Sequence, residues 1–372
     1  MKRKLTALAA AALAALTFAP PANAFAPQTA AATKAMSWLH TQQGADGTVA
    51  GSASRTEDTV IGLVANGESV TSFSTAGKTP IDSLRAHIAD EEKTAGNIGG
   101  LIMAVSAAGL DPSDFAGRNL LQDLACTYNA ATGAYNSQLF NDALAVLAVP
   151  AGALPSKAVD FLAGQQQSDG GWEFGTGYGS DTNTTALVLM ALTSADALNG
   201  TARDKALAYL KVHQKPSGGF EYSTPYTPPG DSDPNSDAAV IQALLAIGED
   251  PVGPAWTVAD RNAVSDLLTF QFENGGLGFS RPGSSATAPP DPLSTSQALT
   301  ALASKHLPVT RTEGELPSTC ATATTPSASP SPAPASGTRQ LAPTGAPWQP
   351  PLAGMLGLAM VALGWRLRRR IA

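Results

Sequence analysis

Ser168-Asp169-Gly170-Gly171-Trp172 separates two apolar segments and sets the structural class of the chain. The segment before it, 158–166, places apolar side chains at helical spacing, and the segment after it, 186–192, is apolar throughout. A glycine pair permits a tight turn that other residues resist. The order predicts a helix, a glycine turn and a second helix, with Trp172 packing back over the helix ends.

The same order recurs along most of the chain. Its next copy has an apolar segment at 206–210, the turn Gly218-Gly219-Phe220 and a second apolar segment at 238–244. Weaker copies open the series near Trp38 and close it at Leu302, with two degenerate units between. A repeat of this length indicates stacked units that share one core. We expect an all-α protein in which about six helix pairs close into an α/α toroid, with the charge-poor second helices forming the inner ring.

The glycine turns also carry a resemblance. Gln165 with Asp169-Gly170-Gly171-Trp172, echoed by Gln214 with Gly218-Gly219-Phe220, resembles the repeat of the prenyltransferase and squalene-cyclase superfamily. The resemblance covers nearly all of residues 25–307 and implies the toroid fold. It says little about activity, because the superfamily includes cyclases, protein prenyltransferases and the toroid of vitamin B12 carriers.

The chemistry of those relatives is not matched by the residues of this chain. A squalene-type cyclase needs the acid motif D-x-D-D-T-A, and the matching stretch here is Asp181-Thr182-Asn183-Thr184-Thr185-Ala186, in which Asn183 and Thr184 carry no acidic proton. A protein prenyltransferase needs Asp, Cys and His around zinc, and Asp237-Ala238-Ala239 lacks the cysteine. We therefore expect no catalytic residues, no metal and no cofactor of these kinds, and whether the chain is an enzyme stays open, leaning to no.

A set of polar residues marks the starts of the second helices: Asp58, Asp142, Asp181, Thr185, Asp233, Asp237 and Thr295. One interpretation is helix capping, because Asp and Thr accept bonds from the first backbone N–H groups. The other is that Asp58, Asp142 and Asp237 face a common cavity and bind a polar or cationic ligand, with aromatic residues such as Trp172 and Tyr222 at its mouth.

Both ends of the chain carry export signals. Residues 1–24 combine a basic start, an apolar run and Ala22-Asn23-Ala24, which is typical of a signal peptide. Residues 341–372 begin with Leu341-Ala342-Pro343-Thr344-Gly345, followed by the apolar stretch 352–365 and four arginines. This arrangement resembles a cell-wall sorting signal, in the L-A-x-T-G form of high-GC actinobacteria. It implies that a sortase cleaves after Thr344 and joins the chain to peptidoglycan; the alternative is a plain transmembrane anchor.

The remaining composition fits an extracellular location. The formal charge is −7 and becomes −14 once both signals, with their seven basic residues, are removed, which disfavours nucleic-acid binding. Residues 308–340 are rich in Pro, Ser and Thr and read as an unfolded stalk. Cys126 and Cys320 are expected to form a disulfide, the alternative for Cys126 being a small buried residue.

Two classes of function stay open at this point. We expect a wall-anchored binding or display module on a non-catalytic toroid, with a small molecule or glycan as ligand. The alternative is an extracellular hydrolase or lyase that uses carboxylates of the rim.

Overall fold

A computed structural model describes residues 25–88, 94–135, 138–150, 152–223, 231–284 and 288–317. Within these residues the chain forms twelve α-helices, two short 3-10 helices and one two-stranded hairpin. The α-helices are α1 (Thr29–Thr41), α2 (Ala53–Ala65), α3 (Pro80–Ala86), α4 (Ala95–Ala107), α5 (Leu120–Thr127), α6 (Leu139–Ala148), α7 (Ser156–Gly164), α8 (Thr182–Ser194), α9 (Gly200–His213), α10 (Pro234–Ala246), α11 (Ala263–Leu268) and α12 (Pro292–Leu302). The hairpin pairs β1 (Trp172–Glu173) with β2 (Ser180–Asp181), and the 3-10 helices are η1 (Pro112–Asp114) and η2 (Pro254–Trp256).

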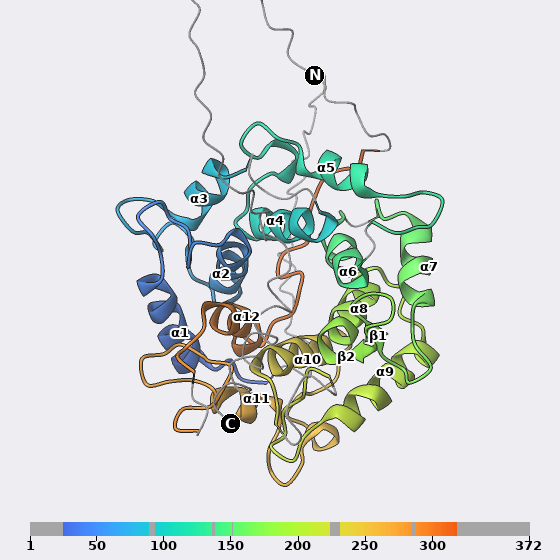
Figure 1. Cartoon of the computed structure of the whole chain (residues 1–372). Helices are drawn as coiled ribbons and strands as arrows, with labels where there is room; N and C mark the ends of the chain where they lie inside the picture. Colours follow the sequence, from blue (N-terminus) through green and yellow to red (C-terminus); the bar gives the residue numbers. More distant parts are fainter. Residues whose placement is uncertain are drawn as a thin grey trace, which may run out of the picture.

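The helices form two concentric rings (Figure 1). The even-numbered helices contact one another in succession from α2 to α12, and α12 contacts α2. The odd-numbered helices lie outside them. The prediction of an α/α toroid built from six helix pairs is therefore confirmed.

The number of charged residues in each helix explains which helix of a pair lies inside. The inner helices α4 and α8 contain no charged residue and bury most of their side chains, whereas the outer helix α9 carries five charged or histidine side chains, which are largely at the surface. A helix that is apolar all round must be covered on most sides. Three inner helices begin at an aspartate whose carboxylate accepts a hydrogen bond from the backbone N–H three residues on, at Asp181, Asp233 and Asp291.

The ring closes through small residues and backbone hydrogen bonds. A Cβ atom added to Gly62 on α2 would lie 2.5 Å from Leu299 Cβ on α12, so only glycine permits this approach. Asn66 Nδ2 donates a hydrogen bond of 3.0 Å to the carbonyl of Leu299. On the outer side, Gln28 N donates to Leu302 O at 2.7 Å, which joins the chain before α1 to the end of α12.

Glutamine side chains hold two of the glycine turns to the following repeat. Gln214 Nε2 donates to Gly218 O at 2.9 Å and to Trp256 O at 2.8 Å. In the preceding repeat this role belongs to Gln166, which donates to Gly170 O and Ala202 O. The repeat glutamine is therefore Gln166, one residue after the Gln165 chosen from the sequence.

The segment after α12 also packs on the ring. Thr312 is buried, with 4% of its surface exposed, and its hydroxyl accepts a hydrogen bond of 3.3 Å from Ser106 on α4. Contact with the toroid thus continues past the expected boundary at Leu307. Residues 318–340 of the predicted stalk lie outside the described residues.

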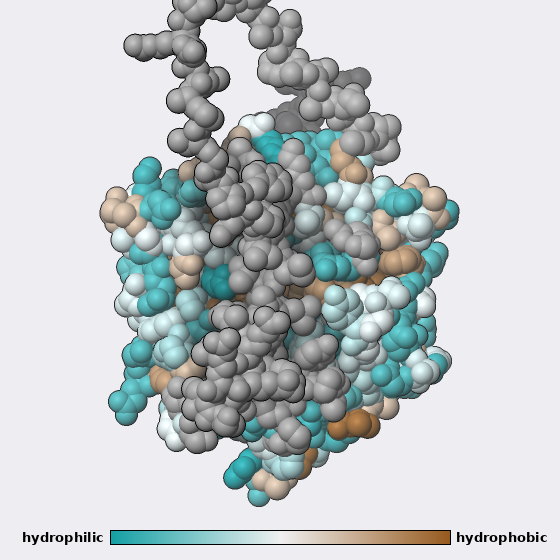
Figure 2. Space-filling view, in the orientation of Figure 1, coloured by the Kyte–Doolittle hydropathy of each residue, from teal (hydrophilic) through white to brown (hydrophobic). Residues whose placement is uncertain are grey.

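Other predictions also fall outside the described part of the chain, namely the signal peptide 1–24 and the sorting signal 341–372. No helix among the described residues is long and apolar enough to cross a membrane. Cys126 lies on α5 and is disulfide-bonded, while its predicted partner Cys320 is not among the described residues. The surface of the described residues that Figure 2 shows is largely hydrophilic.

Candidate functional site

The fourth residue after the N-cap of an inner helix faces the glycine turn of its own repeat. Thr185 Oγ1 accepts a hydrogen bond of 2.9 Å from the backbone N–H of Trp172, the residue that ends the turn. Asp142 and Asp237 occupy the same place in their repeats, and each Oδ1 accepts a bond of 2.6 Å from the corresponding backbone N–H. These two predicted ligand residues therefore hold turns in position.

The predicted aromatic residues are tied into the same framework. Trp172 is fully buried, and its indole Nε1 donates to Leu162 O at 3.0 Å. Tyr222 is half-buried, and its carbonyl accepts a hydrogen bond of 2.9 Å from Thr182 N at the start of α8. Trp172 thus packs over the helix ends as expected, and Tyr222 lies where a turn crosses to an inner helix.

Asp58 lies on a different side of its helix. It is the sixth residue after the N-cap of α2, and because an α-helix turns about 100° per residue, positions two and six lie roughly 200° away from position four. Those positions face the axis of the ring. The structure does not bring Asp58 together with Asp142 and Asp237, and none of the three caps its helix, since the N-caps are Ser52, Gln138 and Asp233.

The axis-facing positions of four successive inner helices carry a network of polar side chains, which we call the polar belt. Asn235 Nδ2 donates to Gln297 Oε1 at 2.6 Å, and Ser294 Oγ donates to Asn235 Oδ1 at 3.1 Å. The Gln297 amide also bonds the carboxylate of Asp58. These hydrogen bonds join α10, α12 and α2. Asn183 stands at position two of the neighbouring helix α8, as Asn235 does on α10, and we count it with the belt for that reason.

Unsatisfied acceptors gather where α8 begins. Among the described residues, Asn183 Oδ1, Thr184 Oγ1 and Asp181 Oδ2 are buried and have no hydrogen-bond partner. Burial raises the pKa of Asp181 to about 7, against the opposing bonds from Thr184. Burial likewise raises the pKa of Asp58 to about 6, and the Gln297 bond opposes this rise. Buried polar atoms without partners are rare in folded proteins. Of these three residues only Asn183 stands at an axis-facing position, so its Oδ1 is the acceptor of the belt that suits a hydrogen-bond donor of a ligand.

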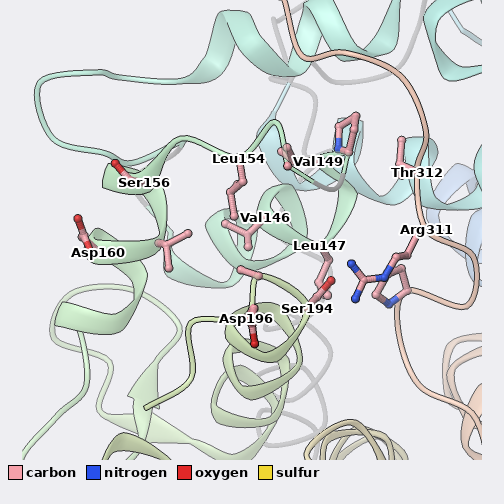
Figure 3. A pocket seen from close by; sticks show the side chains of 15 residues that line it. Val146, Leu147, Val149, Leu154, Ser156, Asp160, Ser194, Asp196, Arg311 and Thr312 are labelled. Atoms are coloured by element: carbon pink, nitrogen blue, oxygen red, sulfur yellow. The ribbon is translucent and has the colours of Figure 1, made fainter.

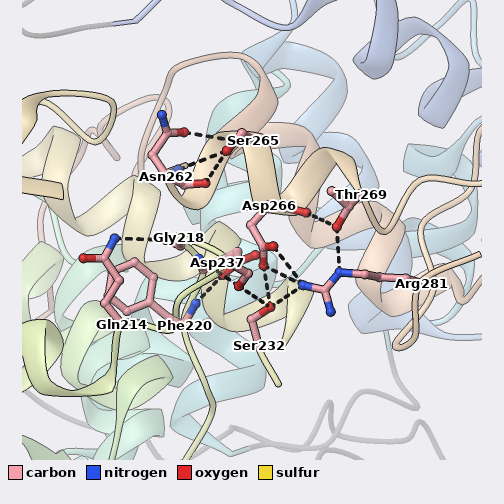
Figure 4. A network of polar contacts seen from close by, with 12 residues as sticks. Gln214, Gly218, Phe220, Ser232, Asp237, Asn262, Ser265, Asp266, Thr269 and Arg281 are labelled. Atoms are coloured by element: carbon pink, nitrogen blue, oxygen red, sulfur yellow. Dashed lines mark hydrogen bonds and ion pairs between the residues drawn. The ribbon is translucent and has the colours of Figure 1, made fainter. Parts of the chain in front are cut away.

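A second polar cluster surrounds the fifth glycine turn (Figure 4). Asp237 and Asp266 are both buried and hydrogen-bonded to each other, and Arg281 Nη2 lies 2.8 Å from Asp266 Oδ1. Burial raises the pKa of Asp237 well above its ordinary value, and the charge of Asp266 raises it further. Ser232 Oγ donates a short hydrogen bond to Asp266, and the Arg281 guanidinium lies 4.2 Å from the centre of the Phe270 ring.

This carboxyl pair is a departure from the repeat. On the neighbouring turns the side chain that packs against the second glycine is Tyr209 or Trp38, whereas on the fifth turn it is Asp266. The site residues predicted from the sequence did not include Asp266, Arg281, Asn235 or Gln297. Alignment of the outer helices on their glycine contacts would have singled out Asp266, because an acidic residue replaces an aromatic one there.

One further hollow lies at the opposite end of the inner helices (Figure 3). It has a volume of about 450 Å³, and its walls come from the ends of α6 and α8, from α7 and from residues 308–312. Asp160, Asp196 and Arg311 edge it, around an apolar floor that includes Val146 and Leu154. It contains none of the predicted site residues. Over the described residues, no group of three His, Cys, Asp or Glu side chains is placed to hold a metal ion.

No family model and no curated protein matches the chain. Solved structures do: a type II terpene cyclase from Scytonema, as a variant in complex with its substrate geranylgeranyl dihydroxybenzoate, is 16% identical with a TM-score of 0.55, over 74% of this chain and 97% of that one. The same cyclase without ligand gives a TM-score of 0.53 at 16% identity over 74% and 97% of the two chains.

A protein from Actinoplanes is similarly close in structure, at 17% identity and a TM-score of 0.52 over 74% of this chain and 99% of that one. Identities this low establish shared architecture and no more. The chain has the α/α toroid fold of the prenyltransferase and squalene-cyclase type, in common with the type II terpene cyclase from Scytonema.

Proposed function

We propose that the toroid is an extracellular binding module, displayed on the cell wall, that holds an uncharged, hydroxyl-bearing small molecule or glycan at the polar belt. The observation that carries the proposal is the row of amide and carboxyl side chains on four successive inner helices, ending at the unpaired Asn183 Oδ1. Amide groups both donate and accept hydrogen bonds, so they suit hydroxyl groups, which do the same. The acidic net charge of −7 disfavours anionic ligands.

Cyclase chemistry is disfavoured by the same residues. Protonation of an alkene needs a strong acid, and the matching positions hold Asn183 and Thr184. Asp58 is the one carboxyl group of the belt, and a pKa of about 6 makes it a weak acid. We therefore do not assign the terpene substrate of the Scytonema enzyme to this chain.

The alternative, a carboxylate-dependent hydrolase or lyase, has one observation in its favour. Asp237 and Asp266 form a carboxyl pair of the kind that shares a proton. Both are buried, at 0% and 3% exposure, and lie behind the glycine turn. A substrate would have to displace Gly219 to reach them. The pair is therefore weaker evidence for catalysis than an exposed carboxyl pair would be. It is also weaker evidence for binding than the polar belt is.

Attachment to the wall is the other half of the proposal. It is supported by Leu341-Ala342-Pro343-Thr344-Gly345 and the apolar and basic residues that follow. With a signal peptide at the other end, this order would place the toroid outside the cell, tethered to peptidoglycan by a sortase.

A thermal-shift screen of the full chain in detergent tests the binding proposal. Cobalamins, isoprenoids and wall glycans serve as probes, because a compound that binds the folded state raises its melting temperature. We expect a hit whose shift is reduced in Asn183→Leu and Asn235→Leu and kept in Gln165→Ala, which lies outside the belt. Product formation from squalene or from a glycan would contradict a binding role, and so would a shift that the belt variants leave unchanged.

A further inference from the structure

Aromatic side chains follow the glycine turns of three successive repeats at one register. Phe174, Tyr222 and Phe279 each come two residues after the residue that ends the turn, in the repeats whose inner helices are α8, α10 and α12. These helices carry Asn183, Asn235 and Gln297 of the polar belt. The aromatic series and the belt therefore belong to the same arc of the toroid.

Hydrogen bonds place two of these aromatic residues at the starts of inner helices. The carbonyl of Phe174 accepts from Phe140 N in the first turn of α6, at 3.4 Å, and the carbonyl of Tyr222 accepts from Thr182 N in the first turn of α8. Each turn thus crosses to the inner helix of the preceding pair. The aromatic residues lie on the face where the belt begins.

The series is extended by the tip of the β1–β2 hairpin. The ring centres of Phe140 and Phe174 are 5.8 Å apart, and those of Phe174 and Tyr178 are 5.9 Å apart. Phe140 occupies axis-facing position two of α6, next along the ring from Asn183 on α8. A continuous row of rings therefore leads from the hairpin tip to the edge of the belt.

Two aromatic side chains of the series are exposed, and one of them lies on a hairpin tip that hydrogen bonds hold in place. Tyr178 is 53% and Phe279 39% exposed, although large apolar side chains are normally covered. The hairpin tip is fixed by Glu173 Oε2, which accepts hydrogen bonds from Gly177 N at 2.8 Å and Gly179 N at 3.2 Å. A fixed loop that presents an aromatic ring loses little entropy when a ligand stacks on it.

We propose that Phe174, Tyr178, Tyr222 and Phe279 form an aromatic crescent that binds a neutral oligosaccharide, with successive sugar rings stacked on successive aromatic rings and their hydroxyl groups directed to the polar belt. The inference rests on the proposed binding function and names its ligand class. Aromatic faces cover the apolar side of a ring, while amide and carboxyl groups satisfy its hydroxyls. Repetition of the aromatic position over three repeats suits a ligand that itself repeats.

Calorimetric titration of the full chain in detergent with chitobiose, chitotetraose and cellotetraose tests the crescent. We expect a tetrasaccharide to bind about 10-fold or more tightly than the disaccharide, because it covers more rings. Tyr178→Ala and Phe279→Ala should each weaken binding about 3- to 10-fold, the fold-change that corresponds to an aromatic contact. Tyr178→Phe and Phe279→Tyr keep the rings and should stay within about 2-fold of the wild type, as should Val212→Ala, an exposed position on outer helix α9.

The outcomes separate the two proposals. If neither tetrasaccharide binds, or if the alanine variants bind as tightly as the wild type, the crescent is wrong, while a non-sugar probe sensitive to Asn183→Leu would leave the belt as a binding site. If the alanine variants lose sugar binding and Asn183→Leu does not, the crescent stands and the belt is not part of the site. Binding of a single aromatic compound to the crescent, without binding of the sugars, would also overturn the assignment of an oligosaccharide as the ligand.

Discussion

Asp237 and Asp266 lie hydrogen-bonded to each other beneath Gly219, close enough that a Cβ added to that glycine would come 2.6 Å from Asp237 Oδ1 and 2.1 Å from Asp266 Oδ2. The two acids come from different helices, α10 and α11, and Arg281 from the following loop neutralises their shared charge. The pair therefore links the fifth and sixth repeats. Its protonation and its partner both bear on the stability of the ring.

Replacement of one aspartate of the pair tests how much the pair contributes to the free energy of unfolding. Asp266→Ala removes the acceptor of Ser232 Oγ and the carboxylate paired with Arg281. It should lower the free energy of unfolding by about 2 to 3 kcal/mol, less than the loss of a fully buried pair would, because Arg281 is 31% exposed. Asp237→Asn is the matched control. Its amide can donate to Asp266 and still accept from Phe220 N–H, so a change within about 1 kcal/mol is expected in urea denaturation. Equal losses in the two variants would contradict this account.

The turn glutamines provide a test with a control one residue away. Gln166→Ala removes the two hydrogen bonds to Gly170 O and Ala202 O that hold the turn to α9 and should cost about 1 to 3 kcal/mol. Gln165→Ala removes no such side-chain bonds and should cost about 0.5 kcal/mol or less. Thermal denaturation of both variants measures the difference, and a greater loss in Gln165→Ala would return the repeat to the register first read from the sequence.

That one-residue error shows what the sequence could and could not decide. Three glutamines stand together at 165–167, and only the contact with the next outer helix selects Gln166. The fold did not depend on this choice, because the glycine turns and the charge-poor second helices recur whichever glutamine is used. Six helix pairs and the inner ring were therefore predicted correctly.

The site depended on helix rotation, which the sequence did not reveal. Asp58 and Asp237 both stand near helix starts, yet two residues of difference in register turn one towards the axis and the other towards its glycine turn. The axis-facing Asn235 and Gln297 were missed for the same reason, since each looks like an ordinary polar residue in a helix start. The N-cap bonds of the structure fix the register that the pattern left open.

Gly170 and Gly177, near the β1–β2 hairpin, allow the stability cost of a steric clash to be measured apart from the cost of backbone strain. Gly170 has φ of +94°, and an added Cβ would lie 2.4 Å from Lys205 O, whereas Gly177 has φ of +86° with no atom within 4 Å. Gly177→Ala should therefore cost about 1 to 2 kcal/mol for the left-handed backbone alone. Gly170→Ala should cost about 3 kcal/mol or more, because helix α9 must also move to relieve the clash with Lys205 O. Similar melting temperatures for the two variants would show that the turn does not need its contact with α9.

Wall attachment is tested by the residue that a sortase would join to peptidoglycan. Thr344 would supply the carbonyl that a sortase transfers, and Thr344→Ala keeps this carbonyl but removes the side chain that the motif requires. The change should therefore release the chain from the wall into the membrane fraction or the medium. Fractionation and immunoblotting of cells that express each form measure this. Gln340→Ala, just outside the motif, is the control, and wall attachment that survives Thr344→Ala would leave a plain membrane anchor as the better explanation.

The last prediction concerns pH. The carboxyl groups of Asp58, Asp181 and Asp237 have raised pKa values in the folded chain, about 6 for Asp58 and about 7 for Asp181, chiefly because of burial. Between about pH 4 and 7 the folded state therefore holds protons that the unfolded state has lost. Since the slope of the unfolding free energy with pH follows protons bound by the unfolded state minus those bound by the folded one, the slope is negative here and stability falls as pH rises.

Groups with lowered pKa values act in another window. Asp46, Asp82 and Asp111 lose their stabilising hydrogen bonds to backbone and hydroxyl groups only as pH falls below about 4, so they do not offset the loss at higher pH. The melting temperature should therefore be highest near pH 4 to 5 and decline towards pH 7. Asp181→Asn keeps an N-cap for α8, because Asn caps about as well as Asp, and should flatten this decline. A melting temperature that rises from pH 5 to 7, or an unchanged slope in Asp181→Asn, would show that these carboxyl groups ionise freely in the folded ring.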